Sequence, residues 1–174
     1  NDQKNSNHKK WNQNGKLTVN IEYDDGEIIS EYYFKKVNNG YLEYRERNGL
    51  LDGGWASWYD LDYKSENGVY KNGKKVGKWV AWHKNRQRRY EAKYVDGTLS
   101  GSYLEWDING NIMKEIDYLK GVPIKEYYTY SDGKFKFIIN KLQGVYEGKW
   151  EKWSDDNIKI EDGTYKNGLK VGTW

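Results

Sequence analysis

The sequence predicts an all-β protein built from repeated hairpins, and three observations lead to this prediction. A glycine, an aromatic residue two positions later and a second aromatic residue three positions after that recur along the chain. Another glycine stands four residues before each of these groups, usually after Asn or Asp. Tyr and Trp are abundant, at 17 and 9 residues, whereas proline occurs once, at Pro123. Aromatic residues favour strands, and their rings suit a thin sheet better than a thick aliphatic core.

The aromatic groups recur at a nearly constant distance. Their first positions, separated by 24, 24, 24, 23 and 24 residues, are Gly53, Gly77, Gly101, Lys125, Gly148 and Gly172. We therefore expect a polar leader over residues 1–10, disordered, and a single repeat domain over residues 11–174. Its units of 23–24 residues begin near positions 23, 46, 70, 94, 118, 141 and 165, and the last unit is expected to be truncated.

Each unit has turn signals in two places. The first is an Asn-Gly or Asp-Gly pair ending at Gly49, Gly73, Gly97 or Gly168, which supplies the positive φ angles of a tight hairpin turn. The second follows the aromatic pair, as in Asn109-Gly110 and Asp132-Gly133. Two short strands and two turns fill 24 residues, so we expect an elongated, twisted, single-layer antiparallel sheet of about seven hairpins.

The aromatic pair is expected to serve both faces of this sheet, since residues three apart on a strand point to opposite sides. Trp79 would then pack between units, and the glycine before it, Gly77, would leave room for a ring of a neighbouring strand. The residues expected to anchor the repeat are Gly53, Trp55, Gly73, Gly77, Trp79, Gly97, Gly101, Tyr103, Gly121, Tyr127, Gly148, Trp150, Gly168, Gly172 and Trp174. The candidate contact face consists of Trp58, Trp82, Trp106, Tyr130 and Trp153.

The frame Tyr-x-Asn-Gly-x-x-x-Gly-x-Trp-x-x-Trp, best seen in residues 70–85 and 165–174, resembles MORN repeats. It is most similar to the bacterial variant in YwqK-like proteins described as antitoxins. Lys125, in place of the second glycine, and Lys141, in place of the tyrosine, depart from the frame. The resemblance implies a sheet of successive hairpins that serves as a scaffold or binding module, with proteins as its usual partners. Membrane lipids have been proposed as ligands of eukaryotic relatives.

Residues for catalysis or metal binding are sparse. The chain has no cysteine and two histidines, His8 and His83, so no nucleophile–base arrangement can be nominated. The acidic runs at residues 107–111 and 154–157 resemble calcium loops only superficially, because neither has the twelve-residue ligand pattern. We therefore expect no enzyme, no metal and no cofactor.

The charge pattern argues against a nucleic-acid surface. Lys and Arg are interleaved with Asp and Glu, and the formal net charge is only +3. The short basic run at residues 86–89 and the Lys–Trp alternation at residues 149–153 are read as strand and turn surface. No apolar run is long enough to cross a bilayer, so no transmembrane segment is expected.

These observations predict a non-catalytic scaffold for protein–protein interaction, of the antitoxin, immunity or surface type. The partner would be a toxin, or a host or envelope protein, and the open sheet edges allow end-to-end self-association. The alternative is a cell-surface module that binds glycan or choline on its Trp and Tyr rows. The polar start at Asn1 favours the cell envelope or secretion, with the cytoplasm as the alternative.

Overall fold

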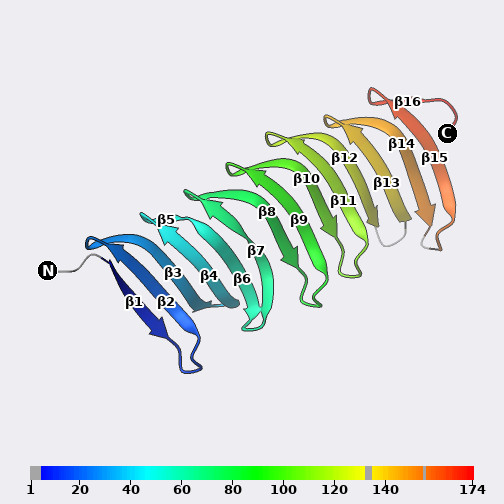
Figure 1. Cartoon of the computed structure of the whole chain (residues 1–174). Coiled ribbons are helices and arrows are strands. Elements are labelled where there is room, and N and C mark those ends of the chain that lie inside the picture. The colour runs from blue at the N-terminus through cyan, green and yellow to red at the C-terminus, as the bar shows by residue number, and fades with distance from the viewer. Residues whose placement is uncertain (1–4, 132–134, 155) are drawn as a thin grey trace. The chain divides into compact units, whose positions relative to one another are not determined.

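The computed structural model describes residues 5–131, 135–154 and 156–174, and these residues contain strands and turns but no helix. The strands belong to one open antiparallel sheet in which each strand lies next to its neighbour in the chain, except that the short β5 pairs beside β4 (Figure 1). The predicted all-β class and the antiparallel hairpin arrangement are therefore confirmed.

The chain divides into two compact units, which we describe separately. The first comprises Asn1–Arg86 with Tyr94–Gly97, and the second comprises Gln87–Lys93 with Thr98–Trp174. The first unit contains β1 (Asn5–Trp11), β2 (Leu17–Asp24), β3 (Glu27–Val37), β4 (Gly40–Arg47), β5 (Leu50–Leu51), β6 (Gly53–Asp60), β7 (Tyr63–Lys71) and β8 (Lys74–Trp82).

Strand β9 (Arg88–Val95) contributes residues to both units. The second unit contains β10 (Thr98–Trp106), β11 (Ile112–Leu119), β12 (Val122–Ser131), β13 (Phe135–Leu142), β14 (Val145–Ser154), β15 (Lys159–Lys166) and β16 (Leu169–Val171). Loops of five residues or fewer join most of these strands, so each hairpin packs directly on the preceding one.

The leader prediction differs from the structure. Residues 5–10 were expected to be disordered, but they belong to β1, which pairs with β2 from Asn5 opposite Asp24 to Trp11 opposite Leu17. His8 lies opposite Ile21 in this pairing. Residues 1–4 lie outside the described residues. The polar composition misled the prediction, because an edge strand exposed to solvent needs few apolar residues once its backbone is paired.

The tight turns have the predicted geometry. Asn72 and Gly73 both have positive φ, at 48° and 77°, as a type I′ hairpin turn requires. The second set of turns consists of longer loops, in which a side chain caps the backbone. Asn12 Oδ1, for example, accepts hydrogen bonds from the N–H groups of Asn14 and Lys16, both at 3.0 Å. The predicted Asp132-Gly133 turn lies outside the described residues.

The loop of Asp107 gives a testable pH dependence. The Asp107 carboxylate accepts a side-chain N–H bond from Asn111 at 2.9 Å and backbone N–H bonds from Asn111 at 2.8 Å and Asn109 at 2.9 Å, and these bonds, the side-chain bond first, lower the pKa of Asp107. Because the folded pKa lies below the unfolded value, this stabilisation is present above about pH 4 and is lost as the pH falls through the folded pKa. We expect Asp107→Ala to cost about 1–2 kcal/mol at pH 7 and much less at pH 3.

Asp107→Asn is the matched control, because Asn12 already caps the corresponding loop between β1 and β2. It keeps an oxygen that can accept the N–H bonds but removes the charge, so at pH 7 it should lose less stability than the alanine variant, and its difference from the wild type should shrink toward pH 3. Denaturant midpoints measured from pH 3 to pH 7 check this prediction. An alanine variant that loses the same stability at both pH values would contradict a role for the ionised carboxylate.

The buried residues lie on both sides of the sheet, with Phe34 and Ala56 on one side and Trp79 and Ala81 on the other. Trp79 is fully buried, at 0% exposure. Its ring lies 5.4 Å from Trp55, 5.1 Å from Tyr70 and 6.2 Å from Tyr94, between ring centres. The ammonium of Lys75 covers it at 3.7 Å. We call the row of Trp55, Tyr70, Trp79 and Tyr94 the ring ladder of the first unit.

The second unit repeats this arrangement. Trp174 lies 5.5 Å from Trp150 and 5.0 Å from Tyr165, again between ring centres, and Lys170 lies 3.7 Å above the Trp174 ring. Corresponding residues are 95 positions apart in the sequence. The angles between the ring planes also match, at 34° for both Trp–Trp pairs. The ring ladder of the second unit is therefore a copy of the first.

The position of the small residue beneath the tryptophan corrects the sequence interpretation. A Cβ placed on Gly77 would meet nothing within 4 Å, whereas one placed on Gly68 would lie 2.2 Å from the Trp79 ring. Gly68 on β7 faces three residues of β8, since Asn67 pairs with Val80 and Val69 with Val76. Gly77 instead has a φ of 67° and forms the bulge that inserts Trp79 over Gly68.

The repeat that lacks this glycine places its rings differently. Lys125 stands where the others have glycine, and the irregularity in the pairing of β11 with β12 moves to the neighbourhood of Pro123 and Ile124. In the resulting register Tyr128 pairs with Lys114 and Tyr127 with Glu115. Tyr127, predicted as a repeat anchor, therefore lies on the opposite face, and Tyr128 takes its place. A lysine cannot easily adopt the positive φ of the glycine bulge.

Candidate functional site

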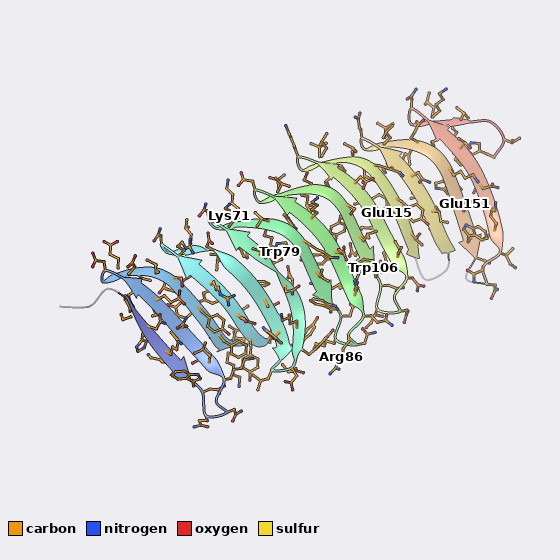
Figure 2. All side chains as sticks on the ribbon, in the orientation of Figure 1. Lys71, Trp79, Arg86, Trp106, Glu115 and Glu151 are labelled. Atoms are coloured by element: carbon orange, nitrogen blue, oxygen red, sulfur yellow. The ribbon has the colours of Figure 1, made fainter. Side chains whose placement is uncertain are left out.

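The candidate contact face lies on the side of the sheet opposite the ring ladder. Trp79 and Trp82 end β8, and Trp79 is fully buried whereas Trp82 is half-buried. Trp58 and Trp82 belong to the first unit, and Trp106 and Trp153 belong to the second. We call these four residues the tryptophan face, and all four side chains are half-buried. Trp79 of the ring ladder and Trp106 are labelled in Figure 2. Tyr130, which was also predicted here, pairs with Phe137 through its backbone, but its side chain lies outside the described part of the structure.

In the first unit, Trp58 is held by an aromatic cluster. Its ring meets the edge of Phe34 at 6.3 Å, and Phe34 stacks on Tyr41 at 5.3 Å. Lys64 lies 4.9 Å above the Trp58 ring, and Lys16 lies 3.6 Å above Phe34. Trp58 Nε1 is buried and has no hydrogen-bond partner among the described residues. Trp58 can therefore offer a partner only ring carbons flanked by ammonium groups.

Two tyrosines fix the end of β8, where Trp82 lies. The Tyr59 hydroxyl donates to the Trp82 carbonyl at 3.0 Å, and the Tyr63 hydroxyl donates to the His83 carbonyl at 2.5 Å. The two tyrosine rings stack at 5.6 Å, and the Arg86 guanidinium lies 5.3 Å above Tyr63. These bonds come from the preceding hairpin, so the position of Trp82 is set before any partner binds.

In the second unit, charged residues surround Trp106 and Trp153. The Arg88 guanidinium lies 6.0 Å from the Trp106 ring and 2.9 Å from Glu91. Lys159 lies 5.6 Å from the Trp153 ring, and Trp153 Nε1 donates to Glu151 at 3.2 Å. In both cases a cation covers the ring and a carboxylate balances its charge. Ion pairs exposed at a surface add little to the free energy of folding, so these groups are better suited to the recognition of a partner protein.

Two of the hollows in the first unit are lined by tyrosine and acidic side chains. One, of about 540 Å³, is lined by Tyr41, Tyr59, Asp60, Asp62 and several other residues, among them Lys36 and Arg86. The other, of about 400 Å³, is lined by Asn20, Glu22, Ser30, Tyr32, Glu43 and neighbours. Burial, and then the charge of Glu43, raise the pKa of Tyr32 to about 12. Tyr32 therefore remains a neutral hydroxyl donor throughout the physiological range.

The residues considered for chemistry occupy turns and strands. His83 lies in the loop after β8, and its carbonyl also accepts the N–H of Arg86. The acidic run at residues 107–111 is the capped loop of Asp107, and in the run at residues 154–157 Ser154 accepts the N–H of Asn157; Asp155 lies outside the described residues. Among the residues that the structure describes, no three His, Cys, Asp or Glu side chains gather as metal ligands would.

The sequence did not point to the hollow at Tyr59 or to its hydrogen bond with Trp82. Tyr59 follows the second tryptophan of one unit only, so the repeat pattern gives it no signal. The repeat pattern describes what the units share, whereas a hollow arises where the units differ, so the pattern does not predict a hollow. The short turn between β3 and β4, at residues 38–39, is one such difference, and it leaves space beside Tyr41.

Comparisons with known proteins leave the architecture as the firm conclusion. The chain matches no model of a protein family, and it matches no curated protein. The fold and the ring ladders define the class of protein, which is an all-β sheet of repeated antiparallel hairpins. Within the described residues, no helix has the length and apolar character required to span a membrane.

Proposed function

We propose that this chain is a non-catalytic repeat scaffold that binds a partner protein through the tryptophan face. The observation that carries the proposal is that each unit has two tryptophan side chains that are only partly buried on the side opposite the ring ladder, Trp58 with Trp82 and Trp106 with Trp153. Tryptophan and arginine dominate the binding energy of protein interfaces. Here they are held on paired backbone, so binding would order few groups and lose little entropy.

The sequence resemblance to MORN repeats supports the same class of function. Its bacterial variant suggests two settings, an antitoxin or immunity protein that covers a toxin, and a surface protein that engages a host or envelope protein. The mixed charges around Trp106 and Trp153 are suited to a protein surface that also carries both signs. They are less suited to a polyanion such as nucleic acid, which selects a segregated basic patch.

Trp82→Ala and Trp106→Ala are expected to weaken binding by about 30-fold or more each, as for the central residues of protein interfaces. The test is affinity capture from lysate of the source organism and from envelope extract, followed by titration of the recombinant partner. Val95→Ala, at a side chain that is 55% exposed beside a hairpin turn, is the control and should bind as the wild type does. A captured protein that binds both tryptophan variants as tightly would contradict the proposed face.

A glycan-binding module is the second candidate, and the hollow of about 540 Å³ favours it. Tyrosines beside carboxylates and an amide, here Tyr41, Tyr59, Asp60, Asp62 and Asn38, can stack on a sugar and accept bonds from its hydroxyl groups. Choline is less suited to the tryptophan face, because Lys64 and Lys159 already cover Trp58 and Trp153. Capture of polysaccharide alone, lost in Asp62→Asn and kept in Trp106→Ala, would favour this candidate.

A further inference from the structure

An exposed apolar strip follows the tight turns of the second unit. Six aliphatic side chains lie at the three tight turns between β11 and β16, four of them flanking the first two turns and two following the third, and each is between 37% and 70% exposed. We call them the aliphatic strip: Leu119, Val122, Leu142, Val145, Leu169 and Val171. Single exposed aliphatic residues are ordinary, but a continuous row of six marks a surface that is covered in the working state.

The first four members share one face of the sheet, because residues opposite each other in an antiparallel pair point to the same side. Leu119 lies opposite Val122, and Leu142 lies opposite Val145. Asp117, two residues before Leu119 and so on its face, pairs with Lys125. Lys125 in turn pairs with Leu142, which links the two hairpins on one side.

The last hairpin continues the same row. Lys149, four residues beyond Val145 on β14, pairs with Thr164, and Thr164 pairs with Val171. The turn of this hairpin is attached to the previous one, because Gly168 donates its N–H to the Tyr146 carbonyl at 2.9 Å. A Cβ on Gly168 would lie 3.2 Å from Val145 Cγ1. The six aliphatic side chains therefore lie on one side of the three hairpins, near their tight turns.

The repeat itself does not require these residues to be apolar. At the corresponding turns of the first unit, the flanking pairs are Asp24 with Glu27, Arg47 with Leu50, and Lys71 with Lys74. Lys74 forms an ion pair with Asp96 at 3.0 Å. The same hairpin thus tolerates charge at these positions. In the second unit, Leu119 with Val122 and Leu142 with Val145 are apolar at both positions, whereas Lys166 stands opposite Leu169 at the last turn. The apolar choice in the first two of these hairpins is therefore not required by the turn itself.

We propose that the aliphatic strip is covered by the aliphatic strip of a second copy of this chain, in a two-fold symmetric dimer. The strip recurs once per hairpin, which is about 10 Å for two strand spacings, and only an identical row has that spacing by construction. Its exposed area is on the order of 500 Å². Two strips would bury about 1,000 Å², at the low end for specific interfaces, so the dimer is expected to be weak.

The charges beside the strip permit this contact. Asp117 is on the face of the strip and Lys120 is in the first turn, while Glu147 and Lys166 flank the last hairpin. A second copy therefore meets both signs rather than a field of like charge. This surface is distinct from the open edge strands, whose pairing was the end-to-end association expected from the sequence. It lies on the same side of the sheet as the tryptophan face, but at the tight-turn end of the strands, whereas the tryptophans stand at the other end.

The test is sedimentation equilibrium of the purified chain between about 10 µM and 1 mM, since weak interfaces of this size have dissociation constants on the order of 0.1 mM. Leu142→Asn, in the central hairpin, should weaken dimerisation at least tenfold. Leu50→Asn changes a side chain that is 50% exposed at a turn of the first unit, and it should leave dimerisation unchanged. A wild type that stays monomeric at 1 mM would overturn the proposal, as would equal dimerisation by both variants.

A second measurement locates the contact. The chain contains no cysteine, so a single one can be introduced without competing pairs. The two-fold axis would pass near the central hairpin, which brings Leu142 of one copy close to Leu142 of the other. Under mild oxidation Leu142→Cys should give a disulfide-linked dimer much faster than Leu50→Cys. Equal rates would show that the copies meet elsewhere and would reject the strip as the interface.

Discussion

Gly68→Ala is expected to lower the free energy of unfolding by about 3 kcal/mol, although alanine is usually the better residue in an ordered chain. The added Cβ would lie 2.2 Å from two atoms of the Trp79 ring. Trp79 has no solvent-exposed surface and is enclosed by Trp55, Tyr70 and Tyr94, so the ring has nowhere to move. The φ angle of Gly68 is not positive, and the whole cost is therefore steric.

Gly163→Ala is the matched control. Its Cβ would lie 2.3 Å from Trp174, in the same geometry, but Trp174 is 36% exposed. The Trp174 ring can rotate toward solvent, so the loss should be about 1 kcal/mol or less. Thermal and denaturant unfolding, followed by tryptophan fluorescence, compare the two variants. Equal losses would mean that the enclosure of Trp79 does not determine the cost.

Trp79→Ala is expected to destabilise the chain by about 3–5 kcal/mol, which is typical of removing a buried aromatic residue from a core. Trp79 is the largest fully buried side chain among the described residues, and it joins rings from β6, β7 and β9. Its removal leaves a cavity between hairpins that the sheet cannot close, because the paired backbones hold the strands apart. We therefore expect loss of cooperative unfolding as well as a lower midpoint.

Trp174→Ala provides the comparison for this variant. Trp174 has equivalent neighbours in Trp150, Tyr165 and Lys170. It lies beyond β16, however, and is only partly buried. Its removal should cost less than half as much. The two variants can be compared by the denaturant midpoint and by the sharpness of the transition. If Trp79→Ala unfolded as sharply as the wild type, the ring ladder would not couple the hairpins.

Much of the fold could be predicted because it depends on short-range signals in the sequence. The pairs of residues with positive φ, such as Asn72 with Gly73, fix a hairpin locally, and the aromatic spacing assigns the two faces. The buried Trp79 and the half-buried Trp82 agree with that assignment. The one repeat that lacks the bulge glycine was recognised as a departure, but its consequence, the exchange of Tyr127 for Tyr128, depends on a register that no local signal specifies.

The identity of the small residue beneath the ring could not be read from proximity in sequence. Gly68 lies nine residues before the bulge glycine Gly77, and only the pairing of β7 with β8 brings it under Trp79. At the corresponding position in the next 24-residue repeat stands Ala92, which is 1% exposed. The residues of the aliphatic strip stand near the turn glycines in the sequence, but the residue types at these positions differ between repeats, so the repeat pattern gives them no signal.

The turns have a direction that bears on how the chain assembles during synthesis. The N–H of Gly73 bonds to the Leu51 carbonyl, and that of Gly97 bonds to the Lys75 carbonyl, both at 2.8 Å. In the second unit, Gly121 and Gly168 bond in the same way to Leu99 and Tyr146. Each donor lies on the C-terminal side of its acceptor. In a chain that leaves the ribosome N-terminus first, each of these carbonyl acceptors is synthesised before its N–H donor. Each new hairpin can therefore pair with a hairpin that has already formed.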